Sequence, residues 1–140
     1  MLAKALLTVG VLVYSVVVPV LEINATHVFN PEWPPHARLH EVWQLATNSM
    51  LGVLALWLTW RKHQVQMPAL LAVLVMGGFL FAWLAGDLYG GSMALGADAP
   101  ERTLLGINIG VIGALLVLAT AVAAVIVDGR RNNRDAHASG

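Results

Sequence analysis

The chain has 140 residues, of which 58% are hydrophobic and only 11% are charged. A soluble domain carries about twice that charged share, so the composition excludes an ordinary soluble enzyme and indicates a membrane protein with one domain. The formal net charge is zero and cysteine is absent. These two facts exclude a nucleic-acid-binding charge field, disulfides, thiolate metal sites and thiol redox chemistry.

Four stretches are long and apolar enough to cross the hydrocarbon core, because a helix needs about 20 apolar residues to span about 30 Å. They are residues 2–23, 39–60, 68–88 and 103–127. The connection 61–67 is so short that it joins two of them as an antiparallel hairpin. We therefore predict an all-α antiparallel four-helix bundle over residues 1–128, followed by a polar flexible tail at 129–140.

The first span follows Lys4, and a cleaved signal peptide is the alternative interpretation of this segment. We favour a retained span, because the apolar run is too long for a signal peptide and no A-x-A site closes it. Asn24 begins a glycosylation sequon that has a use only in a eukaryotic secretory pathway. The sequence thus predicts an integral, multi-pass protein of a plasma membrane or an endomembrane.

Lysine and arginine are distributed unequally between the two predicted faces of the membrane. Arg38 and Arg102 lie on one face, and the other face holds Lys4, Arg61, Lys62, Arg130, Arg131 and Arg134. Because positively charged loops stay inside, we predict that both termini are cytoplasmic. Most acidic residues and histidines, Asp98 among them, fall on the outer face.

The first outer connection, residues 24–38, contains the sequence N-P-E-W-P-P at residues 30–35. Three prolines make this segment too rigid for a flexible linker. We predict that it folds as a short lid and that His27 and Trp33 contact a bound molecule. Trp33 and Trp43 are also typical of aromatic anchors at a membrane interface.

The second span begins with a polar stripe. At about 100° per residue, one arc of the helix holds His36, His40, Glu41, Gln44, Thr47 and Asn48. The opposite arc is apolar and holds Leu39, Val42, Trp43, Leu45 and Ala46. Unpartnered polar groups are costly in hydrocarbon, and Asn48 lies close to the middle of the membrane. We therefore predict that the stripe faces the bundle interior or a water-filled cavity.

The other spans offer polar partners at the depth of this stripe. Glu22 ends the first span, Asp87 ends the third, and Asn108 lies about one turn inside the fourth. We expect all three to converge with the stripe. Gly106 and Gly110 indicate a face of the fourth span that a neighbouring helix or a second copy of the chain approaches closely.

Histidines and carboxylates inside a low-dielectric bundle favour acid–base catalysis. We predict that His40 and Glu41 transfer a proton in an isomerisation, cyclisation or hydration, with His36, Glu22 and Asp87 completing the catalytic set. The predicted substrate is a small lipophilic molecule from the bilayer. The residues expected to bind it are His27, Trp33, Trp43, Gln44, Asn48 and Asn108.

Three alternatives remain open. We expect no cofactor, but His36 and His40 have the spacing of metal ligands, and His27 can join them from the loop to form a zinc or copper site. A small-molecule transporter or ligand-binding membrane protein is the second alternative. The third is a structural or accessory subunit whose polar network only orients the helices.

The sequence N-P-E-W-P-P-H-A-R-L-H at residues 30–40 resembles the N-P-x-W-P-P-H-A-x-x-H signature of a family of small four-span membrane proteins. This resemblance covers only the first loop and the start of the second span. More loosely, the His40 and Glu41 pair and the four-span layout are similar to the emopamil-binding and sigma-2-receptor-like bundles. That likeness implies a membrane cavity in which histidine and carboxylates handle a sterol or an amine ligand.

Overall fold

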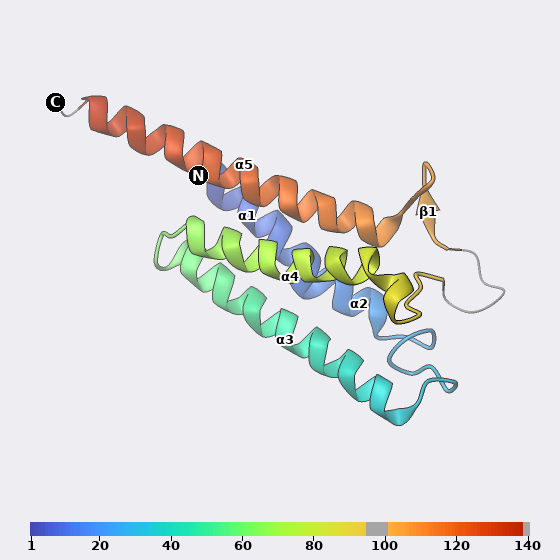
Figure 1. Ribbon diagram of the computed structural model, residues 1–140. Helices are drawn as coiled ribbons and strands as arrows, with labels where there is room; N and C mark the ends of the chain where they lie inside the picture. Colours follow the sequence, from blue (N-terminus) through green and yellow to red (C-terminus); the bar gives the residue numbers. More distant parts are fainter. Residues whose placement is uncertain (95–100, 139–140) are drawn as a thin grey trace.

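The computed structural model describes residues 1–94 and 101–138, and these are mostly helical (Figure 1). The residue Asp98 therefore lies outside the described part. In chain order the helical elements are α1 (Leu2–Leu12), a π-helical segment (Val13–Val17), α2 (Val18–Glu22), α3 (Pro35–Trp60), α4 (Gln66–Leu84), a 3-10 turn (Gly86–Leu88) and α5 (Ile109–Ala138). Two short antiparallel strands, β1 (Thr103–Leu104) and β2 (Ile107–Asn108), precede α5.

Among the described residues, three helical runs are long and apolar enough to cross a membrane, namely Leu2–Glu22, Gln66–Leu84 and Ile109–Ala138. The predictions of a mostly helical chain and of membrane-length helices are thus confirmed in this coarse form. α3 is long enough but less apolar, because polar residues such as Gln44 and Asn48 occupy its first half. Its crossing of the membrane, and the cytoplasmic placement of the termini, stay predictions.

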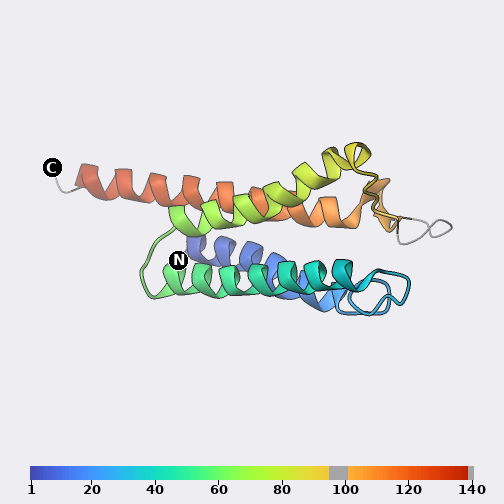
Figure 2. The same cartoon turned by 60° about the horizontal axis from the view of Figure 1, so that its bottom comes forward.

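The helices run side by side (Figures 1 and 2). α1 packs against α5, α5 against α4, and α4 against α3, while α1 and the π-helical segment also contact α3. In Figure 2, α4 and α5 lie along one side of the molecule, and α1, α2 and α3 lie along the other. All the long helices therefore share one core, whose small buried residues are Ala3, Ala55, Ala69, Ala72, Ala114, Ala121 and Ala124.

Glycine and serine bring the first helical run close to α3 and α5. A Cβ added at Gly52 of α3 would overlap the side chain of Ser15, and one added at Gly10 would lie 2.6 Å from Oγ1 of Thr120. Small residues allow such close approach between membrane helices. The predicted Gly106 and Gly110 face differs, because Gly106 lies outside the helix, with nothing within 4 Å of an added Cβ.

Pro19 explains why the first run departs from a regular α-helix. Proline has no N–H, so it cannot donate to the carbonyl of Ser15 four residues earlier. The chain passes through the π-helical segment just before this proline, and the Ser15 carbonyl instead accepts a hydrogen bond of 2.9 Å from the Ser49 hydroxyl of α3. A neighbouring helix thus satisfies the backbone group that proline leaves free, as membrane interiors require.

The fourth helix differs from the predicted span at both ends. Residues 103–108 form a hairpin whose turn residues Leu105 and Gly106 both have positive φ, of 54° and 79°. Two positive φ values are typical of a tight two-residue hairpin turn, but the apolar residues around this turn read as helix by hydropathy alone. At the other end, α5 continues to Ala138, where the sequence predicts a flexible tail. α3 begins at Pro35, so the predicted lid is shortened to residues 23–34.

Candidate functional site

Polar residues gather at the end of the molecule where α2 and α4 finish and α3 and α5 begin. We call this the acidic end, after Glu22, Glu41, Asp87 and Glu101. The opposite end, where α1 starts and where α3 leads into α4, is the basic end, with Lys4, Arg61 and Lys62. Residues 23–34 connect α2 to α3 at the acidic end and the β-hairpin precedes α5 there, whereas a short turn joins α3 to α4.

The loop after α2 folds back on the last residue of that helix. Oδ1 of Asn24 accepts hydrogen bonds of 2.6 Å from both the backbone N–H and the hydroxyl of Thr26, a local turn for which asparagine is well suited. The amide of Asn24 also donates to the Leu21 carbonyl. This turn brings Nε2 of His27 to 2.9 Å from Oε2 of Glu22.

The hydrogen bonds around His27 determine where its protons lie. The single hydroxyl proton of Thr26 is donated to Asn24, so the Thr26 oxygen accepts from Nδ1 of His27, 2.9 Å away. With a proton on Nδ1, a neutral imidazole has a lone pair on Nε2, which faces the Glu22 carboxyl group. One proton therefore lies between Nε2 and the carboxyl oxygen, and either group can hold it.

His27 is partly shielded from water. Its side chain is 22% exposed, and the indole of Trp33 lies edge-on with ring centroids 5.7 Å apart. Burial lowers the pKa of the His27 imidazole, the charge of Glu41 opposes this by raising it, and the charge of Arg102 lowers it. Burial therefore disfavours the charged form of the His27 imidazole.

Glu41 and Arg102 complete this group, which we call the His27 cluster: Glu22, His27, Glu41 and Arg102. Glu41 is half-buried on the second turn of α3 and interacts electrostatically with both Glu22 and His27. Arg102 precedes β1 and interacts electrostatically with Glu22 and His27. From the sequence we used Arg102 only to orient the chain, although an arginine on the acidic face was the available signal.

The structure does not place His40 and Glu41 on one inward face, as the polar stripe predicts. His36, His40 and Gln44 are exposed, whereas Glu41, Thr47 and Asn48 are half-buried. Leu45, on the apolar arc opposite the stripe, is buried. The face of α3 that packs inward follows a spacing of four and three residues, namely Glu41, Leu45, Asn48, Gly52, Ala55 and Thr59. Close packing along this inward face, and not the polarity of the side chains, therefore determines how α3 is rotated about its axis.

The exposed histidines contact each other instead. Nε2 of His36 lies 3.0 Å from Nε2 of His40, with ring centroids 4.5 Å apart and nearly perpendicular planes. Trp43 packs beside the His40 ring at 5.7 Å. Within residues 1–94 and 101–138, no group of three or more His, Asp or Glu residues is arranged to hold a metal ion. The structure thus does not bring His27 to the His36 and His40 pair.

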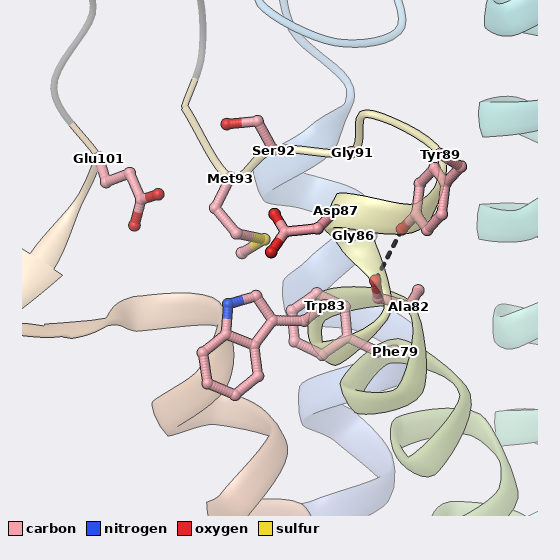
Figure 3. Close-up of a pocket in the computed structure, with 10 residues that line it drawn as sticks. All are labelled: Phe79, Ala82, Trp83, Gly86, Asp87, Tyr89, Gly91, Ser92, Met93 and Glu101. Atoms are coloured by element: carbon pink, nitrogen blue, oxygen red, sulfur yellow. Dashed lines mark hydrogen bonds between the residues drawn. The ribbon is translucent and has the colours of Figure 1, made fainter.

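A second polar region lies at the end of α4. A cavity of about 320 Å³ is lined by Phe79, Ala82, Trp83, Gly86, Asp87, Tyr89, Gly91, Ser92, Met93 and Glu101 (Figure 3). In Figure 3 the carboxyl groups of Asp87 and Glu101 and the Trp83 ring surround the same space. The Tyr89 hydroxyl donates to the Ala82 carbonyl at 2.7 Å, which fixes the rim of the cavity.

Asn108 caps the N-terminal end of α5. Its Oδ1 accepts a hydrogen bond of 2.8 Å from the backbone N–H of Gly110, as a helix-capping asparagine does. Its amide lies 3.4 Å from Oε2 of Glu101. Asp87 thus lines the cavity and Asn108 contacts Glu101 at its edge, whereas we expected both to join the polar stripe. Arg102 follows Glu101 directly and connects this cavity to the His27 cluster.

The imidazole of His27, in contact with Glu22 and close to the charge of Glu41, gives the acidic end the means for acid–base chemistry. Such a set can take a proton from one atom of a bound molecule and deliver a proton to another. Comparisons with protein-family models, with curated proteins and with solved structures find no match to this chain. The function therefore has to follow from the groups that the chain itself brings together.

Proposed function

We propose that this protein is a membrane-embedded enzyme that moves a proton on a small lipophilic molecule, and that the His27 cluster is its active site. The observation that carries the proposal is the 2.9 Å contact between Nε2 of His27 and Oε2 of Glu22, with Nδ1 held by Thr26. Compared with our sequence-based prediction, His27 replaces His40 as the catalytic imidazole, while Glu22 and Glu41 keep their roles.

The cluster suits an isomerisation in which a double bond of the substrate moves by one position. Glu22, holding the shared proton, donates it to one end of the double bond. Glu41 or the Nε2 lone pair of His27 removes a proton from the allylic carbon next to the other end of the double bond, so the number of protons on the substrate is unchanged. A following proton transfer to Glu22, from His27 across their contact or from Glu41 by way of His27, restores the starting state.

The membrane supplies both the substrate and the geometry in this proposal. α3 crosses the bilayer beside the three more apolar runs, giving a four-helix bundle with the basic end in the cytoplasm. The acidic end then lies at the outer face, where a lipophilic molecule can enter sideways from the bilayer. The partial exposure of Glu22 and His27, at 28% and 22% of their side chains, supports access by such a molecule.

Deuterium transfer tests the proposal on the whole mixture of membrane lipids, so that no single substrate has to be chosen. Washed membranes that contain the protein are incubated in D₂O buffer, and extracted lipids are compared by mass spectrometry with those from membranes without it. We expect at least one lipid to gain deuterium with the wild-type protein and not with His27→Gln or Glu22→Gln. His137→Gln, which removes an exposed histidine of α5, is the matched control. Equal labelling by His27→Gln and wild type would reject the assignment.

The cavity beside α4 favours a second candidate function, the binding or transport of a lipophilic cation. Asp87 and Glu101 supply negative charge there, and Trp83, Phe79 and Tyr89 supply aromatic rings. Carboxylates combined with aromatic faces recognise ammonium-type ligands. If this candidate holds, tetraphenylphosphonium binds the purified protein, and Asp87→Asn or Glu101→Gln weakens binding. Glu32→Gln, an exposed carboxylate outside the cavity, should have no effect.

A further inference from the structure

The histidine pair His36 and His40 lies outside the His27 cluster and has no role in the proposed proton transfer. Pro35 occupies the first turn of α3, so both histidines belong to the first two turns of a regular helix. Residues four apart share one face of a helix. Both side chains are exposed, and their Nε2 atoms lie 3.0 Å apart.

This separation is the one that two ligands of a single metal ion require. Imidazole nitrogens bind Zn²⁺ at about 2.0–2.1 Å, and ligands at tetrahedral or right angles are then about 3 Å apart. The alternative explanation is a hydrogen bond between the two rings. Water competes for a hydrogen bond between exposed groups. Such a bond alone therefore contributes little to keeping the two rings together.

The backbone and a neighbouring ring hold the pair in place. A helix fixes the two Cβ atoms one turn apart, and Trp43 packs beside the His40 ring at 5.7 Å. His27 is engaged by Glu22 and Thr26, so the helix alone supplies the two imidazoles. No larger group of His, Asp or Glu ligands is arranged around a common point in the described part of the chain.

We propose that His36 and His40 form an exposed two-histidine binding site for a divalent transition metal ion. Two protein ligands leave the remaining coordination positions to water or to an incoming ligand, so the ion is exchangeable. Imidazole ligands suit copper, nickel and zinc, and the usual order of stability places Cu²⁺ first. This site is independent of the proposed proton transfer, because it shares no residue with the His27 cluster.

Copper titration of the purified full-length chain, without a histidine tag, tests the site. We expect one Cu²⁺ per chain whose electron paramagnetic resonance spectrum shows two imidazole nitrogens. His36→Ala or His40→Ala should leave one imidazole and weaken binding by at least about tenfold, the lower end of the effect of losing even an outer-shell partner. His36→Gln and His40→Gln keep a polar side chain and provide the same test should an alanine variant fold poorly.

Control variants separate this site from the other histidines. His137→Ala and His63→Ala, both exposed and distant in sequence, should keep the wild-type affinity and spectrum. His27→Gln should also bind Cu²⁺ as the wild type does. Wild-type affinity in the folded His36 and His40 variants would overturn the proposal. A loss of affinity in His27→Gln equal to that in His40→Ala would overturn the two-histidine ligand set.

Discussion

The two ends of the molecule use the same residue types for different purposes. At the basic end, Nζ of Lys4 lies 2.6 Å from Nδ1 of His63 and 5.4 Å from the centre of the Trp60 ring. The Trp60 indole N–H donates to Thr8 at 3.0 Å, and Lys62 lies over Trp57. Cations covered by tryptophan are typical of anchors at a membrane interface. His63 there serves as an acceptor for an ammonium group.

At the acidic end, histidine instead faces a carboxyl group and shares a proton with it. This difference between the two ends follows from the segments that connect the helices there. A tight turn joins α3 to α4, so the basic end leaves its side chains open to water, whereas loop 23–34 shields His27 and lowers its pKa. Chemistry is therefore expected where a loop folds over the helix ends, and anchoring where it does not.

The largest expected effect is on catalysis at the acidic end. Glu22→Gln and His27→Gln remove the acid and the base of the proposed reaction, and each should lower the rate of deuterium labelling by about 10²–10⁴-fold. His63→Gln, at the basic end, should leave the rate unchanged. A similar loss in all three variants would erase the functional difference between the two ends.

Gly52→Val should be the most destabilising single change in the core. The added side chain would overlap Ser15, and the helices cannot separate without breaking the hydrogen bond from Ser49 to the Ser15 carbonyl. Overpacking of this kind costs about 1–3 kcal/mol, which thermal unfolding in detergent can measure. Gly78→Val is the matched control, because nothing lies within 4 Å of a Cβ added there. Equal unfolding temperatures for the two variants would contradict the close approach of the first helical run and α3.

The helical fold could be predicted from sequence because long apolar runs determine membrane-length helices almost by themselves. Hydropathy carries no information on how a helix is rotated about its axis, so the exposure of His40 was not predicted. The contact between Glu22 and His27 depends on the turn at Asn24, and hydrophobic periodicity carries no signal for it. The hairpin at Gly106 was missed because its apolar residues resemble a helix end.

A smaller effect is expected on the pH dependence of thermal stability, and it concerns the acidic end alone. Burial lowers the pKa of folded His27 below its unfolded value of about 6.5, so the unfolded chain binds the proton more tightly. The stability that His27 contributes is therefore present above the unfolded pKa, and it is lost as the pH falls through the lower pKa of the folded state. Glu22, Glu41 and Arg102 are the charged groups that interact with the imidazole. His27→Gln should reduce the loss of thermal stability between pH 7 and 5, measured in detergent. An unchanged profile would contradict the shielding of His27.

The smallest effect is expected at the basic end. Lys4→Met keeps an apolar stem of similar length but removes the charge that contacts Trp60 and His63. An exposed cation–π contact contributes about 0.5–1 kcal/mol, so the unfolding temperature in detergent should fall slightly while deuterium labelling stays at the wild-type rate. Lys62→Met, which removes the matching contact with Trp57, should behave in the same way. A loss of labelling in either variant would mean that the basic end contributes to the reaction and that anchoring and chemistry are not separated along the helices.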